Sequence, residues 1–223
     1  MIQTKVPVMN IHLETAIAGL IDIQPTFMPG GGLAVPDGDR IVPVANRVMR
    51  HFAHAFATQD WHPANHSSFA SSHPGRSPYE TIDMPYGKQI LWPDHGIAGT
   101  REAMIHPGID QTRIELIIRK GCRASLDSYS AFFENDRTTP TGLEGWLRQR
   151  GFRHLVLCGL ATDFCVAWSA EDAARLGYQV TVVEDACRAI ALATAPGRTT
   201  MDEARDRLTA LGVTFIHSEA LAD

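Results

Sequence analysis

The sequence is short of cysteine and of positive charge, and it contains no long apolar run. Its four cysteines lie far apart in 223 residues and form no C-x-x-C pair, which argues against a small disulfide scaffold and favours reduced thiols. No apolar stretch approaches the ~20 residues of a membrane span, and the first residues lack the pattern of a secretory signal. We therefore expect a cytoplasmic protein without a membrane partner. The formal net charge of -5 also argues against a nucleic-acid partner.

What the sequence has is a regular alternation of strand-like and helix-like segments. Its content of 44% hydrophobic and 20% charged residues is typical of a globular protein, and we expect one domain over residues 1–223. Apolar, β-rich runs predict six strands, and the amphipathic runs between them predict helices. The strands are expected at 16–23, 55–60, 114–120, 154–160, 179–184 and 213–216, and the helices at 40–52, 142–150, 165–176 and 200–211.

This alternation predicts the fold class. Strands joined by right-handed helical crossovers form a mostly parallel sheet that is covered on both faces. The sequence therefore predicts a three-layer α/β/α fold with a six-stranded, mostly parallel, Rossmann-like sheet. Thr200 and Glu203 have the spacing of a capping box, which predicts the start of the last helix.

Residues 61–112 interrupt the alternation. They contain many of the prolines, glycines and aromatic residues, together with several histidines. An irregular segment of this length in a compact domain is more often functional than idle. We expect this insertion to hold a metal and to cover a substrate.

Four chemically capable side chains fall at or just after the ends of predicted strands. Asp22, Asp60 and Lys120 end three of them, and Cys165 follows a fourth after a short turn. Because ligands of parallel sheets bind beyond the carboxyl ends of the strands, we expect these side chains to converge. Taken singly, Asp22 could equally form a salt bridge or a helix cap, and Lys120 could extend into solvent. Together they supply a carboxylate that can take a thiol proton and an ammonium that offsets the charge.

Cys165 lies where the strand at 154–160 turns into the helix predicted to begin at this residue. The first amides of a helix and its dipole favour negative charge, so we expect them to lower the pKa of this thiol and to favour a thiolate nucleophile. The alternative is a buried structural cysteine, which is common.

A second group combines one carboxylate with several imidazoles. Asp60 and His62 form Asp-x-His directly after a strand, His66 follows four residues later, and His95 lies in the stiff turn Trp92-Pro93-Asp94-His95. Such a set suits zinc, iron or manganese, whereas a single histidine in a polar loop is usually solvated. The density of the cluster favours a metal site.

Aromatic residues stand beside both groups. Phe27, Trp61, Trp92 and Tyr129 could line a slot for a flat ring, although aromatic residues are also ordinary components of a core.

Six motifs taken in order give a specific resemblance that spans nearly the whole chain. They are LIDIQPTFMPGGGLAV, TQDWHPANHSSFA, LWPDHG, RKG, DSYSAFFEND and GLATDFCV. The chain resembles the nicotinamidase/pyrazinamidase branch of the isochorismatase-like cysteine hydrolases. The resemblance implies an isochorismatase-like fold and hydrolysis of nicotinamide to nicotinate and ammonia through a cysteine thioester, a reaction of NAD salvage. Pyrazinamide is a further expected substrate.

The resemblance also implies a role for individual residues. It implies a catalytic triad, a cis peptide bond between Leu160 and Ala161, and an oxyanion hole formed by two backbone amides. It further implies a pocket for nicotinamide and one divalent metal ion, most simply zinc, with iron or manganese as alternatives. These roles fall on Asp22, Lys120 and Cys165 for the triad, Ala161 and Cys165 for the oxyanion hole, Phe27, Trp92 and Tyr129 for the pocket, and Asp60, His62 and His95 for the metal, with His66 as a further ligand in some members.

Other functions remain open at this point. The nearest alternative is a related cysteine amidase that acts on another small amide or carbamoyl compound. A zinc hydrolase with a structural Cys165 and a non-catalytic binding protein are the others. Many relatives have cysteine where this chain has Gly96, and we expect a small effect on the metal site or pocket packing. The sequence leaves the number of subunits open and is compatible with a homo-oligomer.

Overall fold

A six-stranded parallel sheet runs through the protein, as the alternation of segments predicts. The structure, a computed structural model, describes residues 11–221. The order across the sheet is β10-β7-β6-β1-β2-β5, and every neighbouring pair is parallel. The strands are β1 (Ala16–Ile21), β2 (Ala55–Asp60), β5 (Leu116–Lys120), β6 (His154–Leu160), β7 (Gln179–Arg188) and β10 (Thr214–Ile216).

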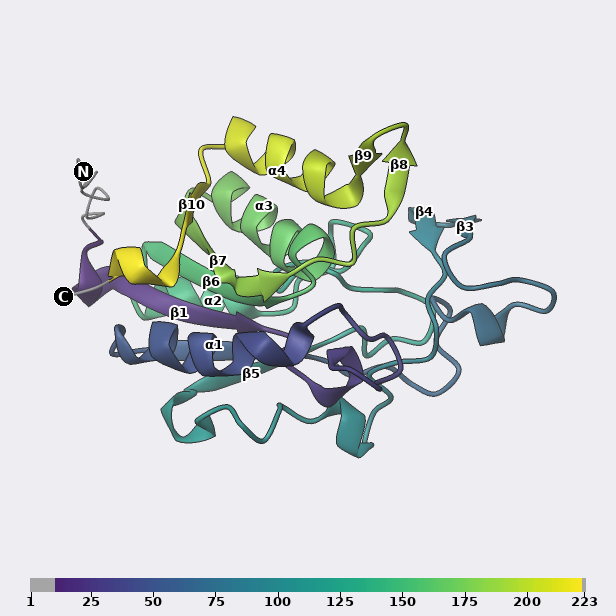
Figure 1. The fold of residues 1–223 in the computed structure, drawn as a ribbon, viewed down its shortest axis with the longest axis horizontal. Coiled ribbons are helices and arrows are strands. Elements are labelled where there is room, and N and C mark those ends of the chain that lie inside the picture. The colour runs from purple at the N-terminus through teal and green to yellow at the C-terminus, as the bar shows by residue number, and fades with distance from the viewer. Residues whose placement is uncertain (1–10, 222–223) are drawn as a thin grey trace, which may run out of the picture.

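Helices cover both faces of this sheet, which confirms the three-layer prediction. The helices are α1 (Ile41–Arg50), α2 (Leu143–Gln149), α3 (Ala167–Arg175) and α4 (Thr200–Ala210). The chain moves from β1 outward to β2, and later from β5 back through β6 and β7 to β10. Right-handed crossovers therefore put α1 on one face and the later helices on the other. Figure 1 shows α1 on one side of the sheet, and α3 and α4 on the opposite side.

The central strands explain why the sequence reads as continuous apolar runs. Every residue of β1 and of β6 is buried, because helices cover both faces and strands lie on both edges. Gly19 of β1 is needed for close packing, since a Cβ there would lie 2.6 Å from side-chain atoms of both Phe56 and Leu157. A larger residue at this position would push the neighbouring strands apart.

The start of α3 and the capping residues of α4 differ from the prediction, whereas α4 itself begins at Thr200 as expected. One wide turn of π-helix, Thr162–Val166, precedes α3, so Cys165 lies inside this turn and not at the first residue of a helix. The capping box of α4 is formed by Thr199 and Asp202, one residue earlier than predicted. Each side chain there bonds the backbone N–H of the other, and the carboxylate suits the positive end of the helix.

Residues 61–112 begin beyond the carboxyl end of β2, and their last part returns along α1 toward the start of β5. They contain the hairpin β3 (Thr81–Met84) and β4 (Gly87–Ile90), and a second hairpin, β8 (Ala193–Ala195) and β9 (Arg198–Thr199), follows β7. In Figure 1 both hairpins lie at the same end of the molecule. Within residues 11–221, no helix has the length and hydrophobicity needed to span a membrane.

Candidate active site

Four buried side chains meet at the carboxyl edge of the sheet. Asp22 follows β1, while Asp60 ends β2 and Lys120 ends β5, and these three strands are neighbours. Cys165 comes from the turn after β6, the other neighbour of β1. Asp22, Asp60, Lys120 and Cys165 are all at most 6% exposed. The parallel topology therefore brings together residues up to 143 positions apart.

Lys120 lies at the centre of this group. Its Nζ is 2.9 Å from Asp22 Oδ2 and 3.5 Å from Cys165 Sγ, and it forms an ion pair with Asp60. It also donates a hydrogen bond of 3.0 Å to the carbonyl of Ser128. Burial disfavours its charge, but Asp22 and Asp60 outweigh burial and hold the pKa of Lys120 well above its usual value. The two aspartates thus favour the charged ammonium form of Lys120, which pairs with both carboxylates.

Asp22 is held in one orientation by Thr58 of β2. The Thr58 hydroxyl donates to Asp22 Oδ1 at 2.6 Å and accepts the backbone N–H of Asp22 at 3.1 Å. This leaves Oδ2 on the side of Lys120. Burial raises the pKa of Asp22 to about 6, while Lys120 opposes the rise and Asp60 adds to it. A carboxylate with this pKa can exchange a proton near neutral pH.

Cys165 differs from expectation in its acidity. Burial raises the pKa of its thiol well above the usual value, and Lys120 only partly offsets the effect of burial and of the two aspartates. The expectation that the first amides of the helix and its dipole lower the pKa of Cys165 is therefore wrong. A neutral buried thiol needs a base beside it, and Asp22 and Cys165 offer atoms within 4.8 Å of each other.

Asp60, His62 and His95 form a group that can hold a metal ion. The Nε2 atoms of His62 and His95 each lie 3.6 Å from Asp60 Oδ2. The Nδ1 atoms contact backbone carbonyls, His62 with Gly121 at 3.0 Å and His95 with Pro93 at 2.8 Å. A carbonyl accepts a hydrogen bond from Nδ1–H, so in the neutral ring of each histidine Nε2 carries the lone pair that can bind a metal ion. One carboxylate and two imidazoles with fixed tautomers fit a divalent metal ion.

His66 lies beside this group but has other contacts. Its ring centroid is 4.4 Å from that of His62, while its Nδ1 contacts Ser68 Oγ at 2.7 Å and its Nε2 contacts the carbonyl of Leu126 at 3.3 Å. Burial and the neighbouring His62 lower the pKa of His66 to about 4, so the ring is neutral at physiological pH. His62, His66 and Asp127 form a second cluster of potential ligands that shares His62 with the first.

Gly121 should be essential for the position of His62. A Cβ at Gly121 would lie 2.2 to 2.4 Å from atoms of the His62 ring, and its φ is +61°. We expect Gly121→Ala to weaken zinc binding by about 10- to 100-fold, as changes around a ligand commonly do. Competition with a chromophoric chelator measures this loss. Gly151→Ala is the control, because φ is +77° there and nothing lies within 4 Å of the added atom. Equal zinc affinity in both variants would contradict the conclusion that Gly121 makes room for the His62 ring.

A small pocket connects the metal group with Cys165. Phe27, Trp92 and Tyr129, the three aromatic residues predicted for the pocket, line it together with Asp60, His95, Ala161 and Cys165. The peptide bond between Leu160 and Ala161 is cis, as the resemblance implies. Trp61 is not part of the pocket and stacks with Arg119 at 3.8 Å. Further lining residues, absent from the sequence predictions, are Leu33, Asp127, Phe164 and Ile190.

Two glutamines fix the surroundings of the pocket and were also missed. The Gln24 side chain bonds both the N–H and the carbonyl of Asp60, at 2.8 and 3.0 Å. Gln89 Nε2 lies 2.8 Å from Asp127 Oδ2 and 2.9 Å from the Tyr129 hydroxyl, which also accepts a bond of 3.0 Å from Trp92 Nε1. Neither glutamine has a signal in the sequence. Thr58, which holds Asp22, does have one: it lies two residues before Asp60 on β2, and residues two apart on a strand lie on the same face.

Gly96 lies directly against Asp60. A Cβ at this position would be 2.9 Å from Asp60 Cβ and 3.2 Å from its carbonyl, and φ is +54°. A cysteine here would therefore have to displace the backbone or the carboxylate of the metal group slightly. Glycine leaves Asp60 free of this contact.

Comparison with known proteins adds a family match. The isochorismatase domain profile matches residues 18–217. The nicotinamidase of Acinetobacter baylyi is 51% identical over 171 residues, which cover 77% of this chain and 80% of that protein. The nicotinamidase of Escherichia coli is 45% identical over 175 residues, with coverage of 77% and 82%.

Solved structures are similar over the whole domain. A nicotinamidase pyrazinamidase of Acinetobacter baumanii has a TM-score of 0.89 at 45% identity and covers 95% of this chain and all of its own. The L. infantum protein PnC1 in complex with nicotinate has a TM-score of 0.79 at 35% identity, with coverage of 94% and 96%. A pyrazinamidase of Pyrococcus horikoshii in complex with zinc has a TM-score of 0.70 at 29% identity, with coverage of 91% and 99%.

Proposed function

The chain belongs to the isochorismatase domain family, and from this premise we propose that it is a nicotinamidase, which hydrolyses nicotinamide to nicotinate and ammonia in NAD salvage. The observation that carries the proposal is one pocket in which Cys165 and the metal group of Asp60 and His95 face a common aromatic lining. The nicotinate complex of a 35% identical structure supports the same substrate class. In this proposal the chain is one domain, and residues 61–112 carry the metal ligands and cover the substrate.

Acylation begins with a proton transfer. Asp22 takes the thiol proton, for which its pKa of about 6 is suited, and the thiolate of Cys165 attacks the carboxamide carbon. Lys120 lies 3.5 Å from the sulfur and stays charged, so it stabilises the negative charge wherever it moves between sulfur and carboxylate. Asp22 then returns the proton to the nitrogen, which leaves as ammonia, and a thioester remains on Cys165.

Deacylation reverses these roles with water. Asp22 removes a proton from a water molecule that attacks the thioester carbonyl, and the released thiolate regains a proton. In both steps the negative oxygen is assigned to the backbone N–H groups of Ala161 and Cys165, both of which line the pocket. Such a donor is worth about 3–4 kcal/mol in other enzymes.

A divalent metal ion fits the group of Asp60, His62 and His95, whose free Nε2 atoms and carboxylate oxygen face one another. We assign zinc to it, which a zinc complex of a 29% identical pyrazinamidase supports. A metal ion held there would supply a Lewis acid for the pyridine nitrogen of the substrate and would help to orient the ring. His66 is proposed as an additional ligand, although it must first give up its contact with Ser68 or Leu126. Phe27, Trp92 and Tyr129 provide flat apolar surface for the ring.

The pH dependence should follow Asp22. Because the base must be ionised to accept the thiol proton, we expect kcat/KM to fall as pH drops below the pKa of Asp22, which is about 6. Each further unit of acidity should lower the rate about tenfold, and the rate should be nearly constant from about pH 7 to 8. Stopped-time ammonia measurements from about pH 4.5 to 8 test this. A rate that is constant across this range would contradict Asp22 as the base.

Ammonia release over a panel of amides tests the function itself. The panel contains nicotinamide, pyrazinamide, small carbamoyl compounds and isochorismate, each with and without a chelator. We expect release from nicotinamide, slower or comparable release from pyrazinamide, and a loss after chelation that zinc restores. Release from a carbamoyl compound alone would favour the alternative, a related cysteine amidase, and release from no ring amide would overturn the nicotinamidase assignment.

A further inference from the structure

The segment that follows β7 contributes one residue, Ile190, to the pocket lining and is tied down at both ends. This segment, residues 190–200 and here called the strap, contains the hairpin β8 and β9. Asp163 accepts the backbone N–H groups of Ile190 and Ala191 at 3.0 and 2.8 Å. It also accepts the hydroxyl of Thr200 at the far end of the strap. One carboxylate therefore closes the strap into a loop.

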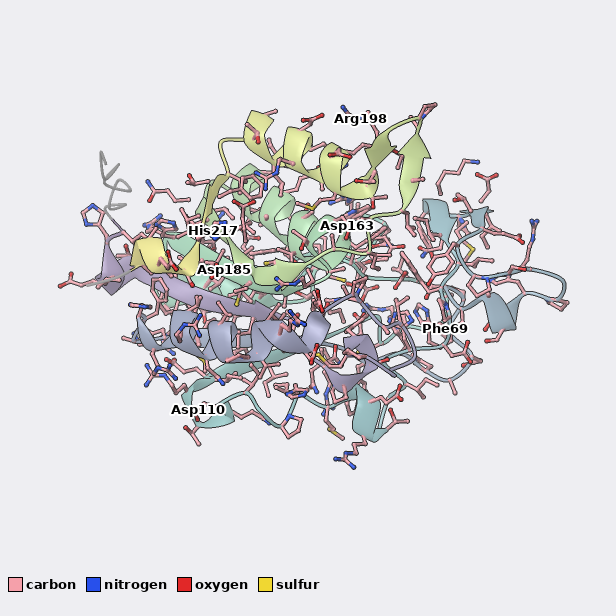
Figure 2. The ribbon with its side chains drawn as sticks, in the orientation of Figure 1. Phe69, Asp110, Asp163, Asp185, Arg198 and His217 are labelled. Carbon is pink, nitrogen blue, oxygen red and sulfur yellow. The ribbon has the colours of Figure 1, made fainter. Side chains whose placement is uncertain are left out.

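Asp163 belongs to the same turn as the nucleophile. It lies two residues before Cys165 in the π-helical turn and is 2% exposed. In Figure 2 Asp163 lies at the end of α3 that is nearest the strap, and Arg198 lies out on the hairpin. The position of the strap is thus coupled directly to the element that carries the sulfur.

Ile190 is the part of the strap that reaches the pocket. It lines the same pocket as Cys165 and Trp92. Among the described residues of this lining, only Ile190 is half-buried, and the others are buried. Ile190 therefore lies at the mouth of the pocket, on the side that is open to solvent.

The backbone of the strap needs the carboxylate to keep this shape. Ala191 has φ of +57°, a left-handed conformation that is unfavourable for any residue with a Cβ. This conformation directs two consecutive N–H groups at one anion, as backbone anion sites do. Thr200 completes the closure, because it accepts the N–H of Leu192 at 3.0 Å and donates its own N–H to the Leu192 carbonyl at 2.8 Å.

We propose that Asp163 is a positioning residue that holds Ile190 as the outer wall of the pocket, and that this wall limits the size of the ring substituents that the enzyme accepts. The second part rests on the proposed nicotinamidase function. Cys165 and Asp22 act on the carboxamide alone, so they do not distinguish ring substituents. An apolar wall at the mouth does so, because an added methyl group must either fit beside Ile190 or displace it.

Asp163→Asn tests the proposal against a matched control. Asparagine keeps the size of the side chain but cannot accept all three hydrogen bonds. Asp185→Asn is the control, since Asp185 likewise accepts the N–H and the hydroxyl of one residue, Ser218, at 2.7 and 2.5 Å. Figure 2 shows that Asp185 lies away from Asp163, toward His217. Both variants lose a carboxylate that accepts backbone and hydroxyl hydrogen bonds, from buried Asp163 in one case and half-buried Asp185 in the other, but only Asp163 holds the pocket wall.

The kinetic readout is a set of ring-methylated nicotinamides. For Asp163→Asn we expect KM for nicotinamide to rise about tenfold with kcat within about twofold, because a binding surface is lost and the chemistry is kept. At least one methylated compound should gain about tenfold in kcat/KM relative to nicotinamide. Ile190→Ala should give the same gain, and combining it with Asp163→Asn should add nothing further, because both substitutions remove the same wall. Asp185→Asn should keep the wild-type ratios. Unchanged ratios in both Asp163→Asn and Ile190→Ala would overturn the proposal.

A second readout does not depend on activity. Trypsin can cut after Arg198 in the exposed hairpin, and release of the strap should speed this cut about tenfold in Asp163→Asn but not in Asp185→Asn. Thr200→Val removes one of the three contacts of Asp163, together with the bond that the Thr200 hydroxyl accepts from Leu192. It should give a smaller increase, which keeps the test available if Asp163→Asn fails to fold. Cleavage at the wild-type rate in both Thr200→Val and Asp163→Asn would contradict the proposal that Asp163 holds the strap. If the wild type released no ammonia from nicotinamide, the proposed function would be wrong. The cleavage rate would still show whether Asp163 holds the strap in place.

Discussion

Replacing Cys165 with alanine abolishes ammonia release from nicotinamide, with an expected loss in kcat of about 10⁴-fold or more. The loss is this large because the thiol is the only group of the pocket assigned to form the covalent intermediate. Nicotinate binding should change little, since the metal group and the aromatic lining stay in place. Ammonia assays measure the first expectation, and calorimetric titration of the zinc-loaded variant with nicotinate measures the second.

Cys187→Ala is the matched control for this variant. Cys187 is also a buried free cysteine, and burial raises the pKa of its thiol to about 12, but it does not line the pocket. We expect this variant to keep kcat within about twofold. Near-normal ammonia release by Cys165→Ala would instead favour a metal hydrolase in which the cysteine is structural.

Replacing Asp22 with asparagine should lower kcat by about 10²- to 10⁴-fold, which is the usual contribution of a positioned base. Asparagine can still accept the hydroxyl of Thr58, so the backbone around it should be preserved. It cannot take a proton from Cys165, whose buried thiol has a pKa raised well above the usual value. The residual activity should also lose the decline in kcat/KM near pH 6 that the wild type is expected to have. The same ammonia assay across pH measures both effects.

Thr58→Val separates the position of Asp22 from its chemistry. The variant removes the two contacts that Thr58 makes with Asp22 and keeps the carboxylate itself. We expect a loss of about tenfold, far smaller than that of Asp22→Asn, with the decline near pH 6 retained. Equal losses in the two variants would mean that Asp22 acts through packing and not as a base.

The sequence could predict the layout of the site because parallel strands deliver their last residues to one edge. The bounds of β2 and β6 were predicted correctly, and those of the other strands within a few residues, except that β7 continues four residues further. Asp22, Asp60 and Lys120 could therefore be placed together from their strand positions alone. Their ion pairs, with Lys120 bridging both aspartates, depend on side-chain geometry that strand positions do not determine.

The missed residues share a physical property. Gln24 contacts residues that are 36 and 79 positions away in the sequence, and Gln89 contacts residues that are 38 and 40 positions away. Neither side chain belongs to a local sequence pattern that would indicate these contacts. The acidity of Cys165 was also misjudged, because the helix amides are a local feature whereas burial comes from the assembled fold. Ile190 and Asp163 are joined across 27 positions, which no spacing in the strap indicates.

The proposed mechanism requires that Cys165 carries the acyl group of a ring carboxamide as a thioester. Turnover of nicotinamide in the presence of hydroxylamine tests this most directly, because a thioester is divided between water and the added nucleophile after ammonia has left. We expect nicotinohydroxamate to replace part of the nicotinate as the hydroxylamine concentration is increased, and we expect Cys165→Ala to form neither product. Nicotinate as the sole product at every hydroxylamine concentration, at an unchanged rate of ammonia release, would contradict it.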